Sequence, residues 1–301
     1  MNILQFSDIT QRHTGRAITV QAQQIGDKPC LLYGDQQYTY AEVNQRVNEI
    51  AAGLAQRGLA RGERVAFYMS SCPEVILLAL AVNKLGAVWV PVNTDYKGAW
   101  LEDTIARSNP HVLVTDAEHA PRVAEIRDML LIEHIAVLGG PAELEGAEDF
   151  AALLVEGAAE PDMSAYDYGD ICSVLWTSGT TGKSKGVMQS HNVWFHAVDS
   201  TIEQFGAAED DVILSVLPMY NSAAWVTGIF RALFSGIPLA IEPSFSVSSF
   251  WERVDYYRAT QTFTLGAMHM FLWYAPPRED VAQHALRQLM AIPMPPHVAA
   301  P

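Results

Sequence analysis

The chain has 301 residues, half of them apolar, and a formal net charge of −15. This length and composition allow one large or two modest globular domains with a sizeable core. The acidic surface would repel a phosphate backbone, which argues against a nucleic-acid partner. The three cysteines, Cys30, Cys72 and Cys172, lie far apart. Their spacing argues against a disulfide framework and against a zinc site, so we predict a reduced, cytoplasmic setting.

Neither an export signal nor a membrane span is expected. Asp8 interrupts the start of the chain where a signal peptide needs an apolar run. The most apolar stretch, residues 75–92, contains Asn83 and Lys84 in its middle and Pro91 near its end. Such interruptions favour a helix, a glycine stop and a buried strand over a transmembrane helix.

The first half of the chain alternates between helical and strand patterns. Thr39 and Glu42 have the spacing of a capping box ahead of apolar residues at helical intervals. Further helices are predicted from residue 73, over 100–108 and over 121–130, and strands over 64–69, 87–92, 111–115 and 135–138. This alternation predicts an α/β fold with parallel sheet.

Residues 139–170 are acidic and rich in glycine, alanine and proline, which is typical of a surface connection. We therefore divide the chain into a first α/β subdomain, 1–170, and a second, 171–301. In the second, strands are predicted over 171–177, 212–217, 238–241 and 262–265, and helices over 191–205, 223–234 and 249–257.

Residues 177–186 read TSGTTGKSKG and suit phosphate binding. A Walker A loop needs glycine where Thr177 stands, so the P-loop interpretation fails on spacing. Glycines that admit close backbone N–H groups, hydroxyl donors and lysines still favour an anion at the end of a strand. A solvated surface hairpin is the competing interpretation.

The segment 175–188, LWTSGTTGKSKGVM, resembles the signature loop of the AMP-forming adenylating enzymes, with Ser184 in place of the usual proline. Residues 62–66 and 84–93 also resemble blocks of that family, and the pair His191–Asn192 is similar to its usual helix start. Residues 250–260 are similar to acyl-CoA ligases of the crotonobetaine/carnitine type.

This resemblance implies an acid–thiol ligase that uses ATP, Mg²⁺ and coenzyme A to activate a small carboxylic acid through an acyl-adenylate. It implies an N-terminal domain of two stacked, helix-flanked and mostly parallel sheets, with a homodimer as a candidate assembly. The implied phosphate-binding residues are Thr177, Ser178, Gly179, Thr180, Thr181, Gly182 and Lys185, with Lys185 also catalytic. Tyr220, Asn221 and Trp225 would border the acid, and Asn221 stands where the family has histidine.

Several blocks that the resemblance leads us to expect are not found: the Tyr-Gly-x-Thr-Glu block, the ribose-binding aspartate, the hinge and the C-terminal lid domain with its catalytic lysine. We therefore expect an incomplete N-terminal domain that is inactive alone. The alternative is a non-catalytic remnant that binds a nucleotide or a partner chain.

Other residues have weaker claims to function. His191 is expected to be structural more often than phosphate-binding, and His196 is expected to pack. Met268, Phe271 and Trp273 have near-helical spacing that favours plain core over an acyl tunnel. His111, His119 and His134 lack metal-ligand spacing, and no metal ligands are predicted.

Overall fold

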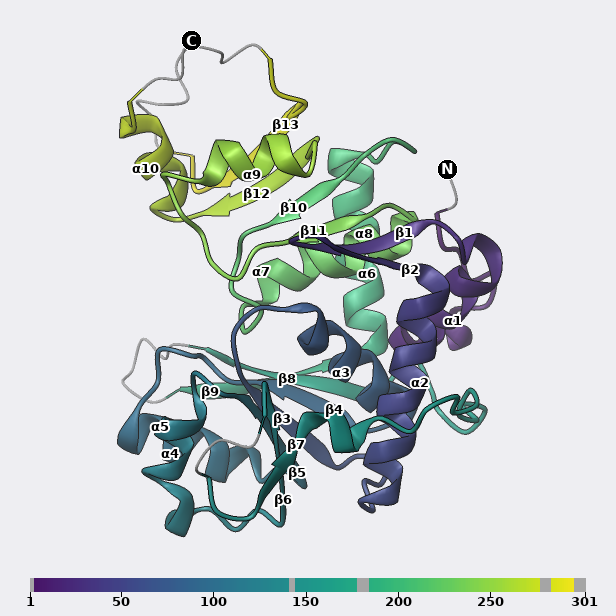
Figure 1. The fold of residues 1–301 in the computed structure, drawn as a ribbon. Coiled ribbons are helices and arrows are strands. Elements are labelled where there is room, and N and C mark those ends of the chain that lie inside the picture. The colour runs from purple at the N-terminus through teal and green to yellow at the C-terminus, as the bar shows by residue number, and fades with distance from the viewer. Residues whose placement is uncertain (1–2, 141–143, 178–183, 277–282, 295–301) are drawn as a thin grey trace.

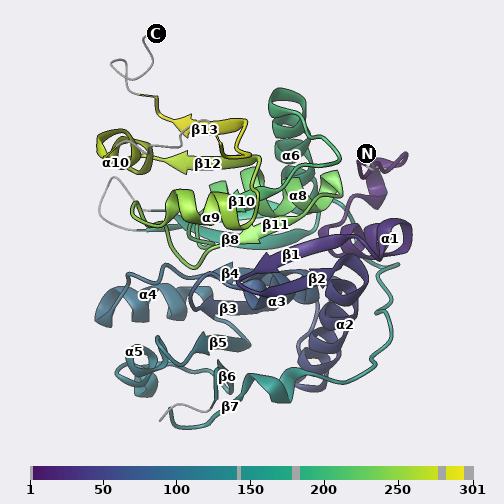
Figure 2. The ribbon, with the colours of Figure 1, turned by 45° about the horizontal axis from the view of Figure 1, so that its top comes forward.

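The computed structural model describes residues 3–140, 144–177, 184–276 and 283–294. Two β-sheets lie one above the other, with helices between them and on their outer faces (Figures 1 and 2). This arrangement confirms the predicted α/β fold with two stacked, helix-flanked sheets. Among the described helices, none is both long enough and apolar enough to cross a lipid bilayer.

The lower sheet in Figure 1 has seven strands in the order β7-β6-β5-β3-β4-β8-β9. All its neighbours pair in parallel except β8 and β9, which form an antiparallel hairpin. The bounds are β3 Arg64–Tyr68, β4 Val88–Pro91, β5 Val112–Asp116, β6 His134–Leu138, β7 Ala147–Asp149, β8 Ile171–Thr177 and β9 Lys185–Ser190.

The upper sheet has six strands in the order β13-β12-β10-β11-β1-β2, and only the β1–β2 pair of these described strands is antiparallel. The bounds are β1 Pro29–Tyr33, β2 Gln36–Thr39, β10 Ile213–Ser215, β11 Leu239–Ile241, β12 Gln261–Leu265 and β13 Gln288–Ile292. Each sheet takes strands from both sides of residue 170, so the proposed division at that residue does not coincide with the division between the sheets.

The helices between the sheets share one large core with strands of both. This core takes buried side chains from α1 Thr14–Ile25, α2 Tyr40–Gln56, α3 Pro73–Lys84, α6 His191–Phe205 and α8 Phe230–Ser235. On the outer face of the seven-stranded sheet lie α4 Gly98–Ser108 and α5 Ala120–Ala124. On the outer face of the six-stranded sheet lies α9 Phe250–Tyr256, with α10 Met268–Tyr274 beyond it.

Short elements complete the chain and change two of the predicted helices. The 3-10 turns are η1 Ile9–Gln11, η2 Arg127–Met129 and η3 Phe150–Leu153. The helix predicted over 121–130 is α5 followed by η2. The helix predicted over 223–234 is instead α7 Ser222–Ala224, a π-helical turn η4 Trp225–Ile229, and α8.

The capping box predicted ahead of α2 and the glycine stop predicted after α3 are both present in the structure. The Thr39 hydroxyl accepts from the Glu42 backbone N–H at 3.2 Å, and the Glu42 carboxylate accepts from the Thr39 backbone N–H at 2.8 Å. The apolar run 75–92 is helix α3, a turn at Gly86 with φ of +66°, and strand β4. The prediction of helix, glycine stop and buried strand is therefore confirmed.

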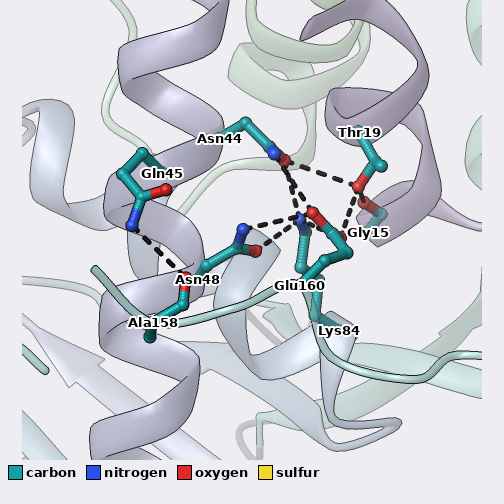
Figure 3. A network of polar contacts seen from close by, with 8 residues as sticks. All are labelled: Gly15, Thr19, Asn44, Gln45, Asn48, Lys84, Ala158 and Glu160. Carbon is teal, nitrogen blue, oxygen red and sulfur yellow. Dashed lines mark hydrogen bonds and ion pairs between the residues drawn. The ribbon is translucent and has the colours of Figure 1, made fainter. Parts of the chain in front are cut away.

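The connection 154–170 has no helix or strand and is held by a polar network around Lys84 (Figure 3). The Lys84 ammonium donates to Asn44 at 2.7 Å and to Asn48 at 2.8 Å, and forms an ion pair with Glu160. Glu160 also accepts from the Thr19 hydroxyl at 2.6 Å. These contacts join the connection to α1, α2 and the end of α3.

Candidate active site

A cavity of about 300 Å³ lies where strands of the two sheets end. Its lining comes from the carboxyl ends of β4 and β8 and from the loop after β10. The lining residues are Pro91, Asn93, Tyr96, Leu175, Trp176, Thr177, Tyr220, Asn221 and Ser222. The carboxyl ends of parallel strands are where open α/β sheets usually bind ligands. The cavity therefore has the position of a substrate site.

The predicted phosphate loop leaves the sheet at one wall of this cavity. Thr177 ends β8 and lines the cavity, and Lys185 begins β9 directly opposite it. The Thr177 hydroxyl donates to the Lys185 backbone carbonyl at 3.4 Å, and the Lys185 side chain is exposed. Ser178, Gly179, Thr180, Thr181 and Gly182 lie outside the described residues. The structure thus brings together the two ends of the loop.

The opposite wall is the loop 218–222, and both sheets hold it in place. The backbone N–H of Met219 donates to the hydroxyl of Ser71, in the loop after β3, at 3.1 Å. Asn221 caps α7, because its side-chain oxygen accepts from the Ala223 backbone N–H at 3.0 Å. Tyr220 and Asn221 both line the cavity, and their assignment to the acid-binding side stays a prediction.

The pKa of the Tyr220 hydroxyl is raised, first by burial and then by the negative charge of Asp95. The hydroxyl is protonated at neutral pH and donates its one hydrogen bond to the Asp95 carboxylate. Asp95 belongs to the β4–α4 loop, which reaches the cavity from the seven-stranded sheet.

Two lining residues from that loop, Asn93 and Tyr96, were not predicted as site residues. The Asn93 side chain accepts from the Asp95 backbone N–H at 2.8 Å, and the Tyr96 backbone N–H donates to the Asn93 carbonyl at 3.1 Å. These bonds form a tight turn directly after a buried strand. The sequence signal that could have identified Asn93 and Tyr96 is their position shortly after the wholly apolar strand β4.

Comparison with known proteins adds the family to this geometry. Residues 18–300 match the family described as AMP-binding enzyme. The chain belongs to the AMP-binding enzyme family. The predicted membership of the AMP-forming adenylating enzymes is therefore confirmed.

Curated relatives of the chain include crotonobetaine/carnitine–CoA ligases. The protein of Salmonella typhi is 30% identical over 282 residues, which are 89% of this chain and 54% of that protein. The protein of Citrobacter koseri is 30% identical over 285 residues, again 89% of this chain and 54% of the relative. The chain spans about half the length of the curated relatives it matches.

Solved structures share the fold. The inhibitor-bound N-terminal domain of FACL13 from Mycobacterium tuberculosis has a TM-score of 0.82 at 25% identity, covering 95% of this chain and 71% of that chain. ATP-bound MatB from Rhodopseudomonas palustris has a TM-score of 0.77 at 25% identity, covering 92% and 54%. An anthranilate CoA ligase in complex with anthranoyl-AMP has a TM-score of 0.83 at 22% identity, covering 94% and 55%.

Trp225 is not among the residues that line the cavity. Its side chain is fully buried, and its indole N–H donates to the Met219 carbonyl at 2.7 Å. Its ring centroid lies 4.2 Å from that of Trp89 and 5.2 Å from that of Phe230. The ring fills the core behind the 218–222 loop, and the assignment of Trp225 to the substrate pocket stays a prediction.

Two histidines and the apolar residues of α10 differ in whether their burial agrees with the prediction. His191 is buried at the base of the β8–β9 hairpin, where its Nδ1 accepts from the Thr14 backbone N–H at 3.2 Å, which fits a structural role. His196 is exposed on α6, so the expectation that it packs is wrong.

Phe271 and Trp273 are 56% and 58% exposed, so the expectation of plain core is wrong for them, because nothing in the described part of the chain covers that face of α10.

Within the described ranges, no three histidine, cysteine, aspartate or glutamate side chains are grouped closely enough to hold a metal ion. His119 is instead 2.6 Å from an oxygen of Asp116. Hydrogen bonds from His119 and from the Ser70 backbone outweigh burial and lower the pKa of Asp116 to about 2. This pair therefore supports the turn after β5.

Proposed function

We propose that this chain carries the acid-binding and phosphate-binding part of an AMP-forming acid–thiol ligase. In the proposed reaction a carboxylate attacks the α-phosphorus of ATP and releases pyrophosphate, and the thiol of coenzyme A then displaces AMP to form a thioester. The observation that carries the proposal is the cavity that Thr177, at the start of the signature loop, lines together with Tyr220 and Asn221.

The roles of the residues follow from their charge. Loop 177–182 would supply N–H and hydroxyl donors, and Lys185 a positive charge, where negative charge grows on the departing pyrophosphate. The side-chain NH2 group of Asn221 would donate to the acid, and the ring of Tyr220 would line the pocket beside it. The described residues hold no carboxylate cluster for Mg²⁺, so we assign no residue of this chain to that ion. The ion would enter with the phosphates of ATP.

We propose the complete reaction for a chain extended to the length of its relatives. Residues 1–301 alone are proposed to bind ATP weakly and to form no acyl-CoA, because adenylation also needs an adenine platform and further positioned charge. A cytoplasmic location and a homodimer stay predictions.

The test is pyrophosphate exchange into ATP with a panel of carboxylic acids that includes carnitine and crotonobetaine. It is run on residues 1–301 and on a chimera that continues into the remaining half of the Salmonella ligase. Acid-dependent exchange by the chimera supports the ligase. ATP binding by both proteins without exchange for any acid supports the alternative, a non-catalytic nucleotide-binding chain. Failure of both to bind ATP contradicts the ligase and supports the other form of the alternative, a remnant that binds a partner chain.

A further inference from the structure

The β8–β9 hairpin that carries the signature loop joins its sheet along one edge, through the pairing of β8 with β4. Because β9 is the edge strand, only β8 connects the hairpin to the strands beyond it. In the described strands, β8 is registered with β4 at a single pair, Trp89 with Ser173. Side-chain contacts at the base of the hairpin add to this pairing.

Asn83, at the end of α3, makes such a contact. It is fully buried, and its side-chain nitrogen donates to the Cys172 backbone carbonyl, in β8, at 2.9 Å. The same nitrogen donates to the Ala87 carbonyl, just before β4, at 3.2 Å. One amide group thus joins the starts of two neighbouring strands.

The acceptor side of the same amide is also fully used. The Asn83 side-chain oxygen accepts from the Thr14 hydroxyl at 2.6 Å and from the Trp89 indole N–H at 3.1 Å. A primary amide offers two donors and two acceptor lone pairs, so its hydrogen bonding is complete. These four partners fix the orientation of the amide, because a flipped group would face carbonyl to carbonyl.

Thr14 then reaches the other strand of the hairpin. Its backbone N–H donates to Nδ1 of His191, the residue that follows β9, at 3.2 Å. Thr14 is fully buried and His191 nearly so. The first residue of α1 therefore holds the end of β9 directly and the start of β8 through Asn83.

We propose that Asn83 and Thr14 are positioning residues that set the phosphate-loop hairpin against the sheet. The inference rests on the proposed function of that loop, and neither residue lines the cavity. The seven residues of β8 span about 20 Å, at about 3.3 Å per residue. A small rotation of the hairpin about its base therefore displaces the far end of β8, at Thr177. Without the Thr14 hydroxyl, the Asn83 amide loses the hydrogen bond that connects it to α1. The starts of β4 and β8, which the amide joins, then lose their connection to that helix through Asn83.

The test uses Thr14→Val, which removes the hydroxyl at nearly constant volume, and Thr14→Ser, which keeps it. Asn83→Asp is a second variant, which removes the donor to Cys172 but keeps acceptor oxygens. The matched control is Gln21→Leu, since the buried Gln21 amide also donates to backbone carbonyls, those of Leu233 and Phe234, away from the hairpin.

Two quantities are measured at a temperature equally far below each variant's melting temperature. They are amide hydrogen exchange of residues 171–177 and 185–190, and the Kd for ATP. Loss of one buried hydrogen bond is worth about a fivefold change in an equilibrium. We expect about fivefold faster hairpin exchange and about fivefold weaker ATP binding for Thr14→Val and Asn83→Asp, with wild-type values for Thr14→Ser and Gln21→Leu.

Unchanged hairpin exchange in both Thr14→Val and Asn83→Asp would overturn the inference. So would an equal effect of Gln21→Leu, because the change would then report general loosening. If the wild type binds no ATP while hairpin exchange responds as expected, the positioning role stands and the proposed function fails.

Discussion

Lys84 and Glu160 form an ion pair in which the ammonium is fully buried while the carboxylate side chain keeps 34% of its surface exposed. The pair joins the end of α3 to the connection that leads into β8. Because of this difference in burial, removing one partner should not cost the same stability as removing the other. An unpaired charge costs more free energy in the interior than near solvent.

We expect Glu160→Gln to lower the free energy of unfolding by about 3 kcal/mol, since it leaves the buried Lys84 ammonium without a countercharge. Lys84→Met should cost less, about 2 kcal/mol, because it leaves no buried charge but removes the donor to the Asn44 and Asn48 side-chain oxygens. Urea unfolding of both variants and of the double variant measures these values. Equal losses in the two single variants would contradict the prediction.

The stability of the chain should fall on acidification through His191. Burial lowers the pKa of its imidazole from 6.5 to about 3. Between these values the unfolded state binds a proton that the folded state does not, so stability is full above pH 6.5 and is lost as the pH falls toward 3. In urea unfolding from pH 7 to 4.5, His191→Gln should have a flatter pH profile than the wild type. The control His196→Gln, an exposed position on the same helix, should follow the wild type.

Lys185→Ala should slow adenylation in the extended chain by about two orders of magnitude while changing the affinity for the acid little. The reason is that its charge acts on the departing pyrophosphate more strongly than on bound acid. Single-turnover adenylation and acid titration separate the two effects. Lys28→Ala is the control, because Lys28 pairs with Glu209 on the exposed surface. An unchanged adenylation rate in Lys185→Ala would refute the assignment.

Asn221→His should change the ranking among acids while leaving the affinity for ATP nearly constant, since Asn221 lines the wall opposite the loop. Asn221→Ser keeps an oxygen that can cap α7 and serves as the control for the helix. Relative exchange rates over the acid panel give the answer. A uniform loss for every acid in both variants would indicate a structural role instead.

Residues 1–301 should associate in solution through α10, where Phe271, Trp273 and Tyr274 are each more than half exposed. Replacing Phe271 and Trp273 by serine should shift the chain toward monomer in light scattering, with little change in the melting temperature. An unchanged size distribution would show that this face is not responsible for association.

Local sequence signals predicted much of the fold because they depend on neighbours in the chain. The capping box at Thr39 and the glycine stop at Gly86 are such signals, and both elements formed as predicted. Helix α1 was missed, since its N-terminal residue Thr14 is held by contacts from distant elements. The β1–β2 hairpin was missed although Gly34, with φ of +54°, marks its turn.

The site was predictable on the side of the signature loop and of Tyr220, where a long motif fixes residue identity. It was not predictable on the side of Asn93 and Tyr96, because the cavity forms only when the ends of β4 and β8 meet the loop after β10 from the other sheet. The burial of Trp225 was not predictable either, because its ring packs against Trp89, from a distant part of the chain, as well as against Phe230.

The pairing of β1 with β11 has a consequence for synthesis on the ribosome. Leu31 is registered with Leu239, so the N-terminal hairpin must wait for about 200 further residues before its neighbour in the sheet exists. At about 5–20 residues per second, that wait is on the order of 10–40 s. The seven-stranded sheet needs no strand beyond β9 and can assemble earlier. During synthesis the β1–β2 hairpin therefore lacks its neighbour in the sheet. Its apolar side, which carries Leu31, can then be bound by chaperones.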